Sequence, residues 1–152
     1  IPASPFSATK RLGVTIDNNI VLERFKKLQH LHDMMLVEGI GGILTPILAN
    51  YYVIDLIKDM NLETIIVTSS KIGTVNHTLM TCKMCEKYNI KIRGLIINDY
   101  EPGYNTSDLK QDFEDLTGVS VLGIIPRIDP FSIETFSQIL SKKIDLKSLI
   151  NF

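Results

Sequence analysis

Polar and glycine residues gather just after four apolar runs of the chain, and each group has a chemistry open to it. Glu38 ends the first run, where a carboxylate can hold Mg²⁺, directly or through water, beside phosphate oxygens. Gly39 and Gly41 follow it and allow the backbone to approach a ligand closely. The structural alternative is a solvated glutamate before a tight turn. The spacing of these glycines does not match a dinucleotide-binding fingerprint.

The second group, Gly73–His77, lies between an apolar run and the start of an expected helix. Free N–H groups at a helix N-terminus attract anions, so this segment is a candidate anion site. Asn76 either caps the helix or bonds a ligand, and capping is the favoured interpretation. His77 is expected to be structural.

The third group is Asn98-Asp99, at the end of another apolar run. An amide side chain offers both a donor and an acceptor to a purine edge. The same dipeptide, followed by Pro102-Gly103, is also a turn signal, and both interpretations stay open. The fourth run ends in the segment 126–130, which contains two prolines.

Two other motifs contain residue types that can bind a metal or form a redox pair. Cys82 and Cys85 form C-x-x-C, but they fall well inside an expected helix and no second such pair occurs, so we expect structural roles. The segment His30–Asp33 falls at an expected helix end, where histidine suits the helix dipole, and we expect no metal there.

The four apolar runs are the expected strands of one sheet. They cover residues 34–38, 64–69, 92–98 and 119–125. Helices are expected over residues 17–30, 52–60, 74–88, 108–116, 131–142 and 145–151, with Asp17 and Ser107 as caps, an irregular lead-in over 1–15 and a glycine-rich loop over 39–46. Continuous apolar strands alternating with helices predict an α/β fold, a doubly wound parallel sheet with helices on both faces. Ligands bind such sheets at the carboxyl ends of the strands, where the four polar groups lie.

Length and charge narrow the class of protein. The 152 residues fit a single domain over 1–152, and 45% hydrophobic residues exclude bulk disorder. Sixteen basic against seventeen acidic residues give a net charge of −1, which predicts no nucleic-acid partner. No apolar run approaches the ~18 residues of a membrane span, and the first residues do not look like a signal peptide, so a cytoplasmic location without membrane association is expected.

Three segments together resemble dethiobiotin synthetase, the ATP-dependent carboxylase and cyclo-ligase of biotin synthesis. MMLVEGIGGILTPI is similar to that family's V-E-G-A-G-G segment, SSKIGTVNHTLMT to its K-L-G-x-I-N-H segment, and IRGLIINDYEP to its strand ending in Asn-Asp. The GIIPRI run fits a strand-proline element near the family's C-terminus. The resemblance covers nearly the whole chain in order and implies a P-loop NTPase-like fold.

The resemblance also implies a role for each matching residue. Glu38 corresponds to the magnesium-associated glutamate and is the implied metal ligand. The residues implied to lie along ATP are Glu38, Gly39, Ile40, Gly41, Asn98, Asp99, Pro126, Arg127 and Ile128. Those implied to receive the substrate's carboxylate tail, which reaches across a homodimer interface, are Gly73, Thr74, Val75 and Asn76. The implied reaction turns 7,8-diaminononanoate, CO₂ and ATP into dethiobiotin, with Mg²⁺.

The family's P-loop, G-x-x-x-x-G-K-[ST], does not occur among the 152 residues. We therefore expect the P-loop and the substrate lysine upstream of Ile1, a fold incomplete at its N-terminus, and no catalytic residue in this chain, which corresponds to the C-terminal two-thirds of the enzyme. Alone, it is expected neither to bind ATP tightly nor to turn over. One alternative is a non-catalytic nucleotide- or partner-binding module of the same P-loop class. Another is a related ATP-dependent protein, such as a cobyrinate amidase domain or a partition ATPase.

Overall fold

The computed structural model describes residues 2–100 and 105–144. They group into two compact units, Ile1–Leu62 and Glu63–Phe152, and each unit is described in its own terms. The single domain over 1–152 stays a prediction. No helix among the described residues is both long enough and apolar enough to cross a membrane.

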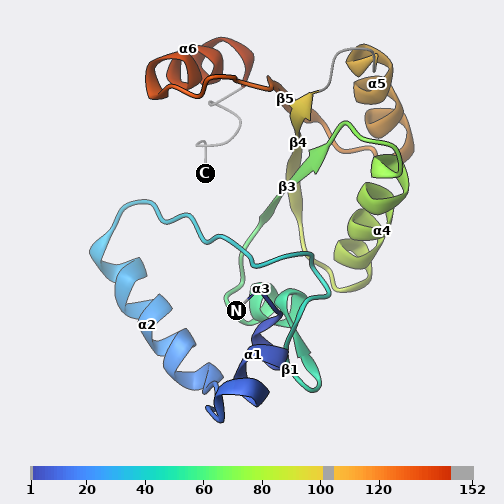
Figure 1. Cartoon of the computed structure of the whole chain (residues 1–152). Coiled ribbons are helices and arrows are strands. Elements are labelled where there is room, and N and C mark those ends of the chain that lie inside the picture. Colours follow the sequence, from blue (N-terminus) through green and yellow to red (C-terminus); the bar gives the residue numbers. More distant parts are fainter. Residues whose placement is uncertain (1, 101–104, 145–152) are drawn as a thin grey trace. The chain divides into compact units, whose positions relative to one another are not determined.

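The second unit contains an α/β fold built on a three-stranded parallel sheet (Figure 1). Its strands are β3 (Thr64–Ser69), β4 (Ile92–Tyr100) and β5 (Val121–Pro126), and they lie in that order across the sheet. Parallel neighbours need a long crossover, and here a helix supplies each one. The three later predicted strands are therefore confirmed, with β4 running two residues further than expected and β5 beginning two residues later.

Three helices flank this sheet. They are α4 (Thr74–Lys87), α5 (Thr106–Thr117) and α6 (Ile133–Lys143). Figure 1 shows α4 and α5 on one side of the strands and α6 on the other. The predicted α/β class, a parallel sheet with helices on both faces, is confirmed in this unit.

Residues 94–97 of β4 and 121–123 of β5 are buried on both faces of the sheet, which favours apolar runs, whereas Val67 of β3 is 62% exposed. Ile96 and Leu122 pack with Ile144 at the end of α6. Leu95 and Ile97 alternate with Ile96 along β4, so they point to the opposite face, which α4 and α5 cover. Side chains with no exposed surface in this unit include Cys85, Leu95, Ile97, Leu109 and Phe113.

The ends of α5 show how local sequence sets a helix boundary. Oδ1 of Asn105 accepts hydrogen bonds from the N–H groups of Ser107 and Asp108, at 3.1 and 3.3 Å. The cap is thus Asn105, and the prediction of Ser107 was wrong by two residues, because an asparagine side chain reaches the same first-turn donors. The helix ends at Gly118, which has a φ of 68° and whose N–H donates to the Glu114 carbonyl at 2.9 Å.

The first unit contains α1 (Pro5–Leu12), α2 (Asn18–Leu31), a two-stranded antiparallel sheet of β1 (Pro46–Leu48) and β2 (Tyr51–Tyr52), and α3 (Val53–Asp59). The helices expected over 17–30 and 52–60 are confirmed as α2 and α3. Asp17 caps α2 as predicted, because its Oδ1 accepts from the Asn19 N–H at 2.9 Å.

The irregular lead-in over residues 1–15 was a wrong prediction, because α1 occupies most of it. Ser4 caps this helix by accepting from the Ser7 N–H at 3.3 Å, Pro5 suits the first turn, and Gly13 ends it with a φ of 64°. The β1–β2 hairpin was not expected either, since its strands are only three and two residues long.

The strand expected over residues 34–38 is the main correction to the fold, because this segment belongs to no strand. Three of its four apolar side chains are exposed, with Leu36 87% and Met34 59% accessible, and Met35 is half-buried. A strand is held by hydrogen bonds to a neighbour, and no described residue pairs with this segment. The run is also rich in methionine and leucine rather than β-branched residues. The helix expected over 145–151 lies outside the described residues.

Candidate functional site

The glycine-rich segment after Glu38 forms a turn closed by one threonine side chain. Oγ1 of Thr45 accepts from the Gly42 N–H at 2.9 Å, and the Thr45 N–H donates to the Gly42 carbonyl at 2.9 Å. The Val53 N–H then bonds the Thr45 carbonyl at 3.1 Å, which fixes the turn to the start of α3. Glu38 itself is exposed ahead of this turn. Thr45 was not predicted from the sequence, although a hydroxyl three residues after Gly42 was a signal for this turn.

Gly41 is the strained point of the turn, and we expect Gly41→Ala to destabilise the first unit by ~1–2 kcal/mol. Its φ is +67°, and an added Cβ would lie 2.6 Å from Oγ1 of Thr45. The matched control is Gly42→Ala, where a Cβ meets nothing within 4 Å and the change should stay within ~0.5 kcal/mol. Chemical denaturation measures both, and equal effects of the two substitutions would contradict this account of the turn.

The loop between β3 and α4 places bare N–H groups at the carboxyl end of the sheet. Gly73 is the N-cap of α4, with a φ of +90° and no side-chain cap. No described residue accepts a hydrogen bond from the N–H groups of Val75 or Asn76. The favoured interpretation of Asn76 as the cap was therefore wrong, because glycine takes the left-handed backbone of the cap position. Val75 and Asn76 leave two donors for an anion.

Strand register brings the other predicted groups of this unit to the same edge. Asn98 pairs with Ser69 across β3 and β4, and Tyr100 pairs with Pro126 across β4 and β5. The β3–α4 loop, Asn98 and Pro126 therefore lie at neighbouring strand ends. Asn98 is exposed and still inside β4, so the interpretation of Asn98-Asp99 as a turn was wrong.

The other residues predicted to bind ATP lie after β5 and in the loop that follows Glu38. Arg127 is exposed and Ile128 half-buried, directly after β5. Glu38, Gly39, Ile40 and Gly41 belong to the first unit, and their loop is exposed. The structure thus brings together the groups at 73–77, 98–99 and 126–130, which all lie in the second unit. The group that begins at Glu38 lies in the first unit.

A magnesium ion is compatible with a single carboxylate here. Within residues 2–100 and 105–144, no three side chains among His, Cys, Asp and Glu come together as a metal cluster. Mg²⁺ usually keeps several waters and takes one or two carboxylates plus phosphate oxygens, rather than a full protein cage. An exposed Glu38 fits that donor set.

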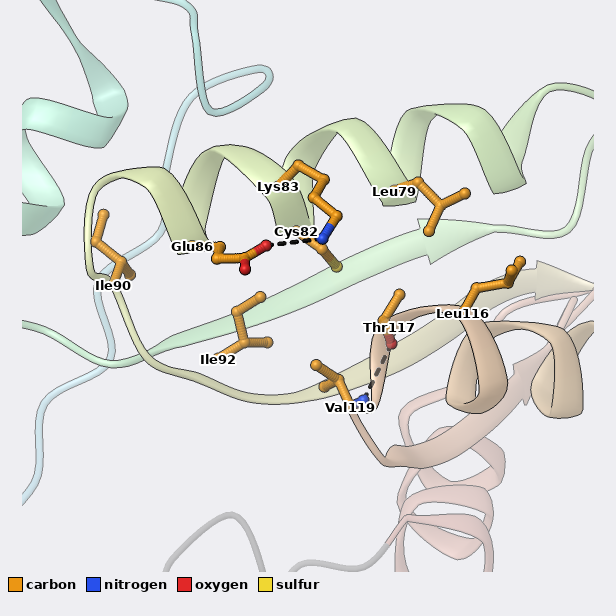
Figure 2. A pocket seen from close by; sticks show the side chains of 9 residues that line it. All are labelled: Leu79, Cys82, Lys83, Glu86, Ile90, Ile92, Leu116, Thr117 and Val119. Carbon is orange, nitrogen blue, oxygen red and sulfur yellow. Dashed lines mark hydrogen bonds and ion pairs between the residues drawn. The ribbon is translucent and has the colours of Figure 1, made fainter.

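A depression of about 270 Å³ lies between the C-terminal parts of α4 and α5 (Figure 2). It is lined by Leu79, Cys82, Lys83, Glu86, Ile90, Ile92, Leu116, Thr117 and Val119. Lys83 and Glu86 form an ion pair of 2.8 Å on α4 at its side. Ile92 begins β4 and Val119 precedes β5, so this depression lies at the amino ends of the strands. None of the predicted site residues lines it.

The two cysteines are free and buried, as their interior helical position predicts. Burial raises the pKa of Cys85 to about 11 and also raises that of Cys82. A neutral thiol is a poor nucleophile and a poor metal ligand, so these residues act as small core side chains.

The raised pKa of Cys85 predicts how the free energy of unfolding changes at alkaline pH. Its pKa is about 11 in the folded chain against 9.0 as the reference value, so folding favours the protonated thiol. This contribution is complete below pH 9 and is lost as the pH rises toward 11. The free energy of unfolding of the wild type should therefore fall more steeply from pH 9 to 11 than that of Cys85→Ala. Equal slopes in denaturant titrations would overturn the assignment.

The second unit is an α/β fold in which the β3–α4 loop, Asn98 and Pro126 lie at the carboxyl ends of parallel strands. A family model described as AAA domain matches residues 1–135, and the chain belongs to that family.

Comparison with individual proteins narrows the family further. The chain is 54% identical over 151 residues to the ATP-dependent dethiobiotin synthetase BioD of Nitrosopumilus maritimus, a match covering 99% of this chain and 66% of that protein. Proteins of the same name from Bacillus velezensis and Bacillus subtilis are 36% and 34% identical over 152 residues, covering 99% of this chain and 65% and 66% of theirs. The resemblance to dethiobiotin synthetases is confirmed, and the chain spans about two-thirds of the length of these relatives.

Proposed function

We propose that these residues carry the base-contacting and substrate-contacting part of an ATP-dependent dethiobiotin synthetase. The observation that carries the proposal is the edge where the β3–α4 loop, Asn98 and Pro126 meet at the ends of parallel strands. The 54% identity to a BioD protein over 99% of the chain supports it.

Glu38 and the glycine turn serve the nucleotide. Glu38 holds Mg²⁺ in this proposal, directly or through water, and Gly39, Ile40 and Gly41 lie along the phosphates. When bound, Mg²⁺ offsets the negative charge of the phosphate oxygens during transfer. Asn98 and Asp99 contact the adenine, and the segment 126–128 lines the base pocket.

The β3–α4 loop serves the other substrate. The bare N–H groups of Val75 and Asn76, with Gly73 and Thr74, receive the carboxylate tail of 7,8-diaminononanoate. Two converging N–H donors and the positive end of the α4 dipole suit a carboxylate. In the proposed assembly this tail comes from a site on the second copy of a homodimer, in the cytoplasm.

The reaction needs positioning more than acid–base chemistry. One amine of the diamine adds to CO₂ and loses a proton, giving a carbamate. The carbamate oxygen takes the γ-phosphoryl group of ATP and releases ADP. The second amine attacks the carbamoyl carbon, a C–N bond forms, the C–O bond to phosphate breaks, and phosphate and a proton leave with the ureido ring closed.

The 152 residues contain no G-x-x-x-x-G-K-[ST] motif, and a second candidate function for them is a non-catalytic nucleotide- or partner-binding module of the same P-loop class. Without a phosphate cradle, we propose that the chain alone does not turn over. Dethiobiotin formed by residues 1–152 alone would contradict this part of the proposal.

A chimera separates the two candidates. Residues 1–152 replace the matching region of the Nitrosopumilus maritimus synthetase, whose remaining third supplies the rest of the protein. ADP release should require both 7,8-diaminononanoate and bicarbonate. A folded chimera that binds ATP but releases no ADP with these substrates would favour the non-catalytic module. ADP release with a different acceptor would favour a related ATP-dependent enzyme.

A further inference from the structure

Three threonine hydroxyls connect the end of β3 to the first turns of α4. Oγ1 of Thr68 lies 2.7 Å from Oγ1 of Thr74 and 2.7 Å from Oγ1 of Thr78. Oγ1 of Thr74 also donates to the carbonyl of Ser69 at 2.7 Å. Thr74 and Thr78 are only 3% and 2% exposed, so water does not replace these bonds.

The direction of this chain of hydroxyls follows from counting protons. A threonine hydroxyl has one proton to donate. Thr74 gives its proton to the Ser69 carbonyl, so Thr68 must donate to Thr74, and Thr78 must then donate to Thr68. The donors therefore run in one direction, from Thr78 to Thr68, from Thr68 to Thr74 and from Thr74 to the Ser69 carbonyl. Hydrogen bonds in such a chain polarise and strengthen one another.

This chain of hydroxyls, Thr78–Thr68–Thr74, ends where the bare donors begin. The carbonyl of Ser69 is the last of β3, and Thr74 is the first residue of α4. The Thr74 N–H closes the loop by donating to the Lys71 carbonyl at 3.1 Å, and the next two N–H groups are those of Val75 and Asn76. A fixed Thr74 therefore fixes the direction of the two donors that follow it.

We infer that Thr68 is a positioning residue for substrate binding, acting through Thr74 on the N–H groups of Val75 and Asn76. The inference rests on the proposed function, which gives these N–H groups the substrate's carboxylate. Thr68 is the centre of the chain because it alone bonds both other hydroxyls. A side chain of the same shape without the hydroxyl leaves two buried hydroxyls short of a partner.

The first test uses the chain of residues 1–152 as it stands. In Thr68→Val, hydrogen exchange of the Thr74 and His77 amides, which donate to Lys71 and Gly73, should quicken ~10-fold. Thr68→Ser keeps the hydroxyl and should restore the wild-type rate. The control Thr81→Val removes a hydroxyl that bonds only the His77 carbonyl of its own helix, and should leave both amides unchanged.

Unchanged exchange in Thr68→Val, or a serine variant as fast as the valine variant, overturns the inference. If Thr68→Val does not fold, Thr78→Val replaces it, because the bond between Thr68 and Thr74 survives there. Exchange of the Thr74 amide should then quicken ~3-fold, and an unchanged rate counts against the inference.

The second test uses the chimera and measures KM and kcat for 7,8-diaminononanoate. Thr68→Val should raise KM for 7,8-diaminononanoate ~10-fold and leave kcat within about 2-fold, and Thr68→Ser should restore KM. An equal loss in kcat, without a change in KM, contradicts a positioning role in substrate binding. A wild-type chimera without activity would overturn the proposed function, whereas the exchange rates would still decide what Thr68 does to the loop.

Discussion

Glu38→Gln in the chimera is expected to lower the rate of ADP release by ~10²–10³-fold at ordinary Mg²⁺ concentrations. The substitution keeps the shape of the side chain and removes the charge that Mg²⁺ prefers in a ligand. Raised Mg²⁺ should recover part of the rate, since an amide oxygen still coordinates weakly.

The control for this prediction is Glu23→Gln, which removes another exposed carboxylate of the first unit, on α2. It should leave the rate and its Mg²⁺ dependence unchanged. Wild-type activity in Glu38→Gln, or the same loss in both variants, would remove Glu38 from the metal site.

Phe113→Ala is expected to destabilise the second unit by ~3–5 kcal/mol. Phe113 lies on α5, has no exposed surface and is the largest of the fully buried side chains. Its removal leaves a cavity on the face of the sheet that α4 and α5 cover, and cores close such cavities only in part. Urea denaturation, monitored by circular dichroism, measures the loss.

The matched control is Leu116→Ala on the same helix, because this leucine is 54% exposed. Its cost should stay below ~1 kcal/mol, since most of its surface already meets water. Similar losses for Phe113→Ala and Leu116→Ala would mean that α5 does not pack as described.

The strands of the second unit were predictable because each is dominated by apolar residues, although Val67 of β3 is 62% exposed. TIIVTS over 64–69 and the run from Ile92 are β-branched and continuous, and each becomes a strand with a paired neighbour. The run over 34–38 is also mostly apolar, yet it is not a strand. Pairing depends on a neighbouring chain, and hydrophobicity alone does not reveal whether one is present.

The sequence predicted which segments form the candidate site, but not the side-chain contacts that hold those segments in place. The β3–α4 loop and Asn98 lie at one edge because parallel strands end together. The hydroxyls of Thr45 and Thr68, which hold the two loops, were not foreseen. Threonine is common in strands and turns, and only the three-dimensional distances show which hydroxyls pair.

The most direct test of the central claim is mass spectrometry of the chimera's product after incubation with 7,8-diaminononanoate, ATP, Mg²⁺ and isotopically labelled bicarbonate. We expect dethiobiotin with a single labelled carbon in its ureido carbonyl, and ADP and phosphate in equal amounts. A folded chimera that yields no labelled dethiobiotin, under conditions where the Nitrosopumilus maritimus synthetase does, would contradict the proposed function.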